Sequence, residues 1–104
     1  MEVQYTGRDN ETDLQLTSKR QAIELVGITK FELNLTKSGS TNTAKNSTDN
    51  PTVFTVQPDG KTLRIILGHQ NLDLGTWRAV LITYDADNPA GIVWGSFQIE
   101  IKIE

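Results

Sequence analysis

The last eight residues of the chain, 97–104, read Phe-Gln-Ile-Glu-Ile-Lys-Ile-Glu, an unbroken alternation of apolar and polar side chains. A helix would scatter the four apolar residues around its axis. A β-strand instead places all four on one face and the polar residues on the other. Residues 30–36 alternate in the same way, and residues 63–67 do so with one interruption. This period of two predicts a chain built from strands.

The segment 76–84 differs from these strands because it is apolar on both sides. Its apolar side chains divide between two faces: Trp77, Ala79 and Leu81 against Val80, Ile82 and Tyr84. Strands that are apolar on both faces lie in the middle of a sheet with both faces covered. We therefore expect a central strand here, with one face in the core and the other partly covered.

Turn signals separate the strands and complete the fold prediction. Pro58-Asp59-Gly60 lies between two apolar runs, as in a tight hairpin. Shorter strands are expected at residues 3–6, 13–17, 22–26 and 53–57, and no segment predicts a convincing helix. Seven or eight short strands without helices favour an antiparallel β-sandwich of immunoglobulin-like type, with a β-barrel as the alternative.

One polar stretch, residues 37–51, interrupts the alternation without a single large apolar side chain. Such a segment cannot offset its ordering entropy by burial, so we expect a flexible loop within a single domain spanning residues 1–104. Long loops inside a compact domain are often functional, although a tolerated surface insertion would look the same. The stretch supplies four candidate partner-contact residues: Ser40, Asn42, Lys45 and Asn46.

Composition excludes several classes of function. The 104 residues include no cysteine and one histidine, and the net charge is −3. Thiolate metal sites, disulfides and cysteine nucleophiles are therefore excluded, and no basic excess attracts nucleic acid. No apolar run approaches the length of about 18 residues that a membrane-spanning helix needs. Isolated glycines form no phosphate-binding loop, so the sequence predicts no cofactor.

The polar residues most suggestive of chemistry have plainer explanations. His69 stands alone among polar neighbours and is interpreted as a solvated loop residue. Residues 85–88, Asp-Ala-Asp-Asn, lack the glycine and the later glutamate of a calcium loop, so we expect a turn capped by its own side chains. The sequence thus predicts neither an enzyme nor a metal site.

Aromatic residues give a second functional hypothesis, the binding of a glycan or cell surface. Trp77 belongs to the predicted core face, whereas Trp94 begins the last strand and is expected to be partly exposed. An exposed Trp94 or Tyr84 beside polar groups would suit stacking against a sugar. Packing alone also explains aromatic residues at such positions, so both residues remain candidate contacts.

Four segments resemble the immunoglobulin-like domains of tailed-phage baseplate and tail proteins, most closely the N-terminal domain of baseplate upper proteins. They are the step Leu-Val-Gly-Ile-Thr at 25–29, the hairpin at 56–65, the strand entry at 74–81 and the terminal hairpin at 84–95. The baseplate upper proteins continue into further regions, whereas this sequence stops at Glu104. The family has no catalytic residues to carry over.

The resemblance implies a structural part of a virion, made in the bacterial cytoplasm and assembled in several copies at the tail or baseplate. Its partners would be other virion proteins and further copies of the chain, rather than nucleic acid or membrane. The edge strand at 3–6 or at 97–103 is a candidate for strand addition to a neighbour. Lys102 and the flanking glutamates favour a protected edge instead.

Overall fold

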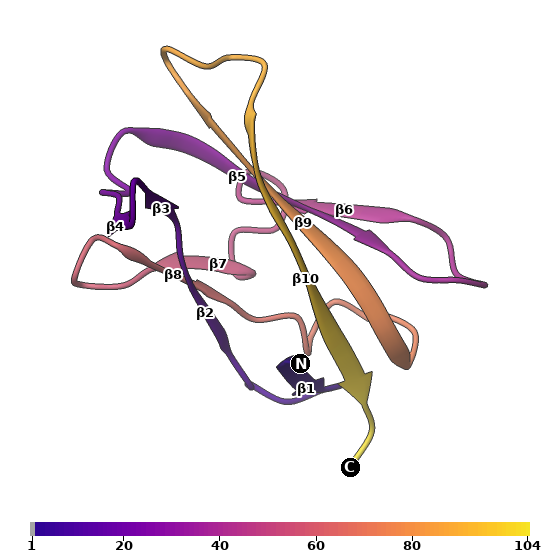
Figure 1. Cartoon of the computed structure of the whole chain (residues 1–104). Coiled ribbons are helices and arrows are strands. Elements are labelled where there is room, and N and C mark those ends of the chain that lie inside the picture. The colour runs from indigo at the N-terminus through magenta and orange to yellow at the C-terminus, as the bar shows by residue number, and fades with distance from the viewer. Residues whose placement is uncertain (1) are drawn as a thin grey trace.

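The structure, a computed structural model, describes residues 2–104 and consists of strands, turns and irregular segments, with no helix in that range (Figure 1). Ten strands follow in chain order: β1 (Glu2–Tyr5), β2 (Thr12–Gln15), β3 (Thr17–Ser18), β4 (Gln21–Ala22), β5 (Ile28–Thr36), β6 (Thr43–Asn46), β7 (Phe54–Val56), β8 (Thr62–Ile65), β9 (Gly75–Asp85) and β10 (Ile92–Lys102). The predicted all-β class is confirmed. The strands outnumber the seven or eight predicted, and two of them, β3 and β4, have only two residues each.

Two main sheets organise these strands. The larger sheet has five strands in the order β1-β10-β9-β5-β6, and the smaller has three in the order β2-β8-β7. Every neighbouring pair is antiparallel except β1 and β10, which run parallel. β3 and β4 pair as a separate short hairpin. The hairpin between β9 and β10 projects at one end of the molecule, which we call the upper end (Figure 1).

Alternation along the strands assembles one apolar core from both sheets. The inward side chains of the larger sheet come from β5, β9 and β10, and those of the smaller sheet come from β7 and β8. Phe31 of β5 stacks on Phe54 of β7 across the two sheets, with ring centroids 6.1 Å apart. Burial of each large apolar side chain contributes about 1.5–3 kcal/mol. Trp77 is 2% exposed, as predicted for a core residue.

The polar stretch 37–51 contains a strand that the sequence prediction of a loop missed. β6 lies within it and pairs with β5 through the register Glu32↔Asn46 to Leu35↔Thr43. An edge strand needs no large apolar side chain, because the ladder of backbone hydrogen bonds with its neighbour holds it in place. Asn46 ends the strand, and its side-chain oxygen accepts hydrogen bonds from the backbone N–H groups of Thr48 and Asp49.

The hairpin between β7 and β8 forms at the predicted Pro58-Asp59-Gly60 turn. One oxygen of the Asp59 carboxylate accepts the backbone N–H groups of Lys61 and Thr62, both at 2.9 Å. These bonds favour the charged carboxylate, so the pKa of Asp59 lies below its usual value, with the Lys61 backbone bond the largest cause. Gly60 takes the positive φ of 70° that the turn requires.

A buried glutamine joins the first strand to the smaller sheet. Gln4 of β1 is 0% exposed. Its amide nitrogen donates to the Thr12 hydroxyl at 3.1 Å and to the Ile65 carbonyl at 3.0 Å. Its amide oxygen accepts the Leu67 backbone N–H at 2.7 Å. β1 therefore pairs with the larger sheet through its backbone and with the smaller sheet through one side chain.

Candidate interaction surfaces

The six predicted contact residues do not form a single surface. Ser40 and Asn42 lie in the loop between β5 and β6, and Lys45 and Asn46 lie on β6 itself. Tyr84 lies near the end of β9 and Trp94 near the start of β10. The β5–β6 loop and the β9–β10 hairpin project in different directions (Figure 1). Any contact role must therefore be assigned to separate patches.

Side chains in the polar stretch are already engaged within the chain. The Ser40 hydroxyl donates to the Asp73 carboxylate at 2.7 Å, which joins the β5–β6 loop to the segment before β9. The Asn46 side-chain nitrogen donates to Asp49, and its backbone N–H donates to the side chain of Asn50. Asn42 is exposed. These bonds give the stretch a defined shape, with Asn42 the most accessible of its four candidates.

Trp94 and Tyr84 lie on opposite faces of the larger sheet, so they cannot form one aromatic platform. The Trp94 indole N–H donates to the hydroxyl of Thr83, a residue that is 1% exposed on the core side. Tyr84 follows Thr83 along β9 and therefore points to the other side. Trp94 remains half-buried and packs against the core. Its predicted partial exposure is confirmed.

The outer face of the larger sheet is the side that points away from the core, and it carries Tyr84. Here β9 contributes Val80 and Ile82, and the register places Val93 of β10 beside Ile82. Val93 is 65% exposed, and Val80 and Ile82 are half-buried. The central strand is therefore apolar on both sides, as the sequence predicted.

Charged groups flank Tyr84 on the outer face. Its hydroxyl donates to the Glu32 carboxylate at 3.1 Å, and the Lys30 ammonium lies 4.4 Å from the ring centroid. Burial raises the pKa of Tyr84, and the hydrogen bond to Glu32 and its negative charge add to that shift. Further along β9, Arg78 also lies on this face. The outer face therefore combines an apolar centre with charges of both signs.

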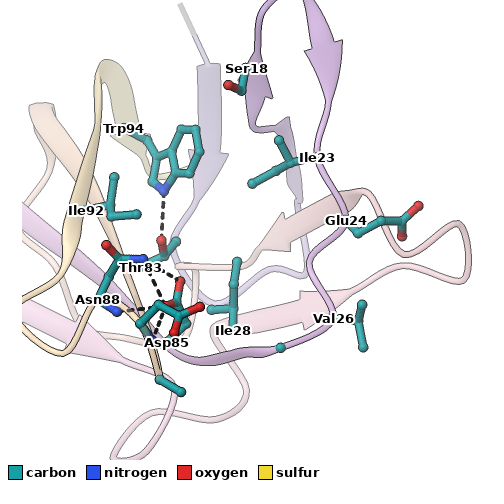
Figure 2. Close-up of a pocket in the computed structure, with 13 residues that line it drawn as sticks. Ser18, Ile23, Glu24, Val26, Ile28, Thr83, Asp85, Asn88, Ile92 and Trp94 are labelled. Atoms are coloured by element: carbon teal, nitrogen blue, oxygen red, sulfur yellow. Dashed lines mark hydrogen bonds between the residues drawn. The ribbon is translucent and has the colours of Figure 1, made fainter.

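A cavity of about 560 Å³ opens at the upper end, between the β9–β10 hairpin and the segment that joins β4 to β5. Figure 2 shows Trp94 and Ile92 on one side of this cavity and Ile23 and Glu24 on the other. The Asp85 carboxylate accepts the backbone N–H groups of Asp87 and Asn88, each at 2.9 Å, so the predicted self-capped turn is confirmed. The Asp85 carboxylate in the cavity wall is thus already engaged in internal hydrogen bonds.

A smaller groove of about 250 Å³ opens at one side of the molecule, where β2 of the smaller sheet faces β10 of the larger sheet. We call it the edge groove, and its lining residues are Leu14, Gln15, Leu16, Leu81, Trp94, Gly95, Ser96 and Phe97. Sequence reasoning did not find it, because strand alternation does not reveal which strands of two sheets lie opposite one another. Its only sequence signal is an uncharged run that begins the last strand.

The structure corrects the expectation for one of the two candidate edge strands. β1 pairs with residues 99–102 of β10, so that part of the last strand lies inside the sheet rather than at its edge. β1 itself is an edge strand, as predicted for residues 3–6. Residues 92–98 of β10 lie outside this pairing.

The remaining polar candidates lie at the surface. His69 is exposed, and its Nε2 lies 2.6 Å from an Asp9 carboxylate oxygen. Arg64 forms hydrogen bonds with both carboxylate oxygens of Asp13, and these bonds lower the pKa of that carboxyl. Within residues 2–104, no three acidic or histidine side chains gather as a metal site would require. The same range holds no helix of the length and hydropathy needed to cross a membrane.

The chain matches none of the protein-family models, and no curated protein matches it.

Proposed function

We propose that the chain is an immunoglobulin-like β-sandwich. The strand order supports this assignment: β5, β9 and β10 correspond to strands C, F and G of the immunoglobulin fold, and β6 adds to C as in variable-type domains. The order β2-β8-β7 corresponds to strands B, E and D of the opposite sheet. Contact between Phe31 and Phe54 across the sheets supports face-to-face packing.

We further propose that this domain is a structural module of a phage tail or baseplate and acts through protein–protein contacts. The outer face of the larger sheet carries the proposal, because Val80, Ile82 and Val93 form an apolar centre on the side away from the core, where Val93 is 65% exposed. Arg78 and Glu32, of opposite sign, lie on the same face, which suits packing against a second copy. The resemblance to baseplate domains supplies the biological setting.

The expected result for this proposal is reversible self-association. Replacing Ile82 with lysine would place a charge in the apolar centre and weaken association at least tenfold, because the charge would lose water in the interface. Ala44→Glu tests the same face from the exposed edge strand β6, where it does not disturb the core. Sedimentation velocity over a range of protein concentrations measures both effects.

The matched control is Thr55→Lys on β7, an exposed position of the other sheet. This variant should associate like the unmodified chain. A chain that stays monomeric at millimolar concentration, or outer-face variants that associate as well as the control, would contradict the proposed surface. Immunogold labelling of tailed particles with an antibody against the chain tests the virion setting independently.

Glycan binding is a second candidate function, favoured by one observation: the half-buried Trp94 ring beside the upper cavity (Figure 2). A glycan array probed with the labelled chain is expected to give signals that Trp94→Ala removes. Tyr84→Phe is the control, since Tyr84 lies on the opposite face and its loss of one hydroxyl should leave those signals unchanged. An array without signals, or signals that Trp94→Ala leaves unchanged, would contradict glycan binding at Trp94.

A further inference from the structure

Most of β10 has a free edge on the side where β1 lies. β10 has eleven residues, and β1 pairs only with residues 99–102. Within residues 2–104, the other seven residues of β10, 92–98, therefore have no paired strand on that side. Seven extended residues span about 23 Å. Their outward N–H and C=O groups form a template for another strand. We call residues 92–98 the upper edge of β10.

The upper edge lacks most of the features that protect natural sheet edges. Charged side chains, prolines, short length and β-bulges are the usual protection. Residues 92–98 contain no charged residue and no proline, and only a bulge between Val93 and Gly95 interrupts the strand. By contrast, β6 and β2 have four residues and carry Lys45 and Asp13, and β7 has three. The upper edge is thus the longest uncharged free edge in the described chain.

The edge groove lies beside this upper edge and gives it an apolar floor. None of its eight lining residues is charged. Leu14, Trp94 and Phe97 pack against the core but remain half-exposed. The two sheets therefore leave their shared core incompletely covered along the side where the upper edge is free.

We propose that the upper edge and the edge groove together receive an extended segment of a partner protein. The segment would add to the larger sheet as a strand beside β10, in line with β1, through main-chain hydrogen bonds. Its alternate side chains would cover Leu14, Trp94 and Phe97. Because the lining is uncharged and the groove holds about 250 Å³, the inward residues would be small apolar ones such as valine. This inference rests on the proposed function as a protein-contact module and names one surface and one kind of partner.

A seven-residue peptide that alternates valine and threonine is the probe. Hydrogen–deuterium exchange of the full chain should slow at least tenfold at the outward amides of residues 92–98 when the peptide is added. Amides of β6 should not change. A peptide with proline at its centre should give no protection, because it lacks the central N–H and breaks the added strand.

Two variants test the groove. Gln15→Lys places a charge at its rim without removing a core side chain, and should abolish protection. Thr55→Lys, on the edge strand β7, is the matched control and should retain it. Circular dichroism confirms that each variant is folded before the exchange experiment.

Three outcomes would overturn the proposal: no protection at millimolar peptide, equal protection of the β6 and β7 edges, or protection that rises with protein concentration when no peptide is present. The last would identify a second copy as the occupant. The proposed self-association is tested separately, since Ile82→Lys should weaken it and leave peptide protection intact. Failure of the groove and failure of the outer face are therefore distinguishable.

Discussion

Replacing Gln4 with methionine should lower the free energy of unfolding by about 3 kcal/mol. Methionine nearly matches glutamine in volume, so the change removes hydrogen bonds rather than packing. The Leu67 N–H would lose its acceptor, and the Thr12 hydroxyl and the Ile65 carbonyl would lose a donor. Each buried polar group left without a partner costs about 1–3 kcal/mol. Removing the amide itself from the core offsets part of that sum.

Urea unfolding followed by tryptophan fluorescence measures this effect, because Trp77 is buried and Trp94 half-buried. Gln15→Met is the matched control: its amide nitrogen makes one exposed hydrogen bond to Thr62, at 3.3 Å, and its loss should cost little. Equal stability of the Gln4 and Gln15 variants would mean that the buried glutamine does not join the sheets. A changed dependence on urea concentration would instead indicate that β1 is released as a unit.

Gln4 also shows that the polarity of a side chain does not fix which face of a strand is buried. The polar Gln4 is 0% exposed, whereas its apolar neighbour Val3 is 36% exposed. The polarity of a side chain predicts its exposure only where the folded protein offers it no specific hydrogen-bond partner. The partners of Gln4 come from residues 8 to 63 positions away in the chain, and a single sequence does not show that they converge.

Prediction succeeded where burial alone decides the arrangement. β5 and β10 show clean alternation, and their inward residues Leu33, Leu35, Ile99 and Ile101 are at most 2% exposed. β9 was recognised as central because both of its faces are apolar. The turn at Asp59 was recognised because its chemistry is local, with donors two and three residues along the chain.

The missed features depend on how strands meet rather than on what each contains. β6 was missed because its stability comes from the backbone of β5, which leaves no pattern in its own side chains. The parallel pairing of β1 with the end of β10 was likewise hidden, and with it the free upper edge. Trp94 and Tyr84 were grouped as aromatic residues, yet they lie on opposite faces of the sheet. Trp94 contacts Thr83, and Tyr84 is the next residue after Thr83, so its side chain points to the other face.

These missed pairings also produce the candidate partner site. Gln4 and the register with Ile99 hold β1 at the lower part of β10, and so leave the upper part without a neighbour. The same arrangement keeps the edge groove open above β1. Stability of the first strand and accessibility of the groove therefore follow from one feature, the position of a four-residue strand along an eleven-residue one.

Replacing Gly68 with alanine should destabilise the chain by about 3 kcal/mol or more, at the upper end of overpacking costs. Gly68 is buried, and a methyl group there would overlap the Arg8 carbonyl oxygen and lie 2.8 Å from that of Tyr5. Both are backbone atoms, which cannot rotate away as a side chain can. The segment after β1 would have to move, and with it the hydrogen bond from the Gly7 N–H to the Gly68 carbonyl, 2.7 Å long.

Gly39→Ala separates this crowding from the general effect of adding a methyl group to glycine. Gly39 has a φ of 81°, but nothing lies within 4 Å of the added carbon, so only backbone strain of about 1–2 kcal/mol is expected. Urea unfolding of both variants should therefore place Gly68→Ala clearly below Gly39→Ala. If the two were equally stable, the segment that follows β1 would not pack against Gly68. In that case, the close backbone contact at Gly68 would not determine where β1 ends.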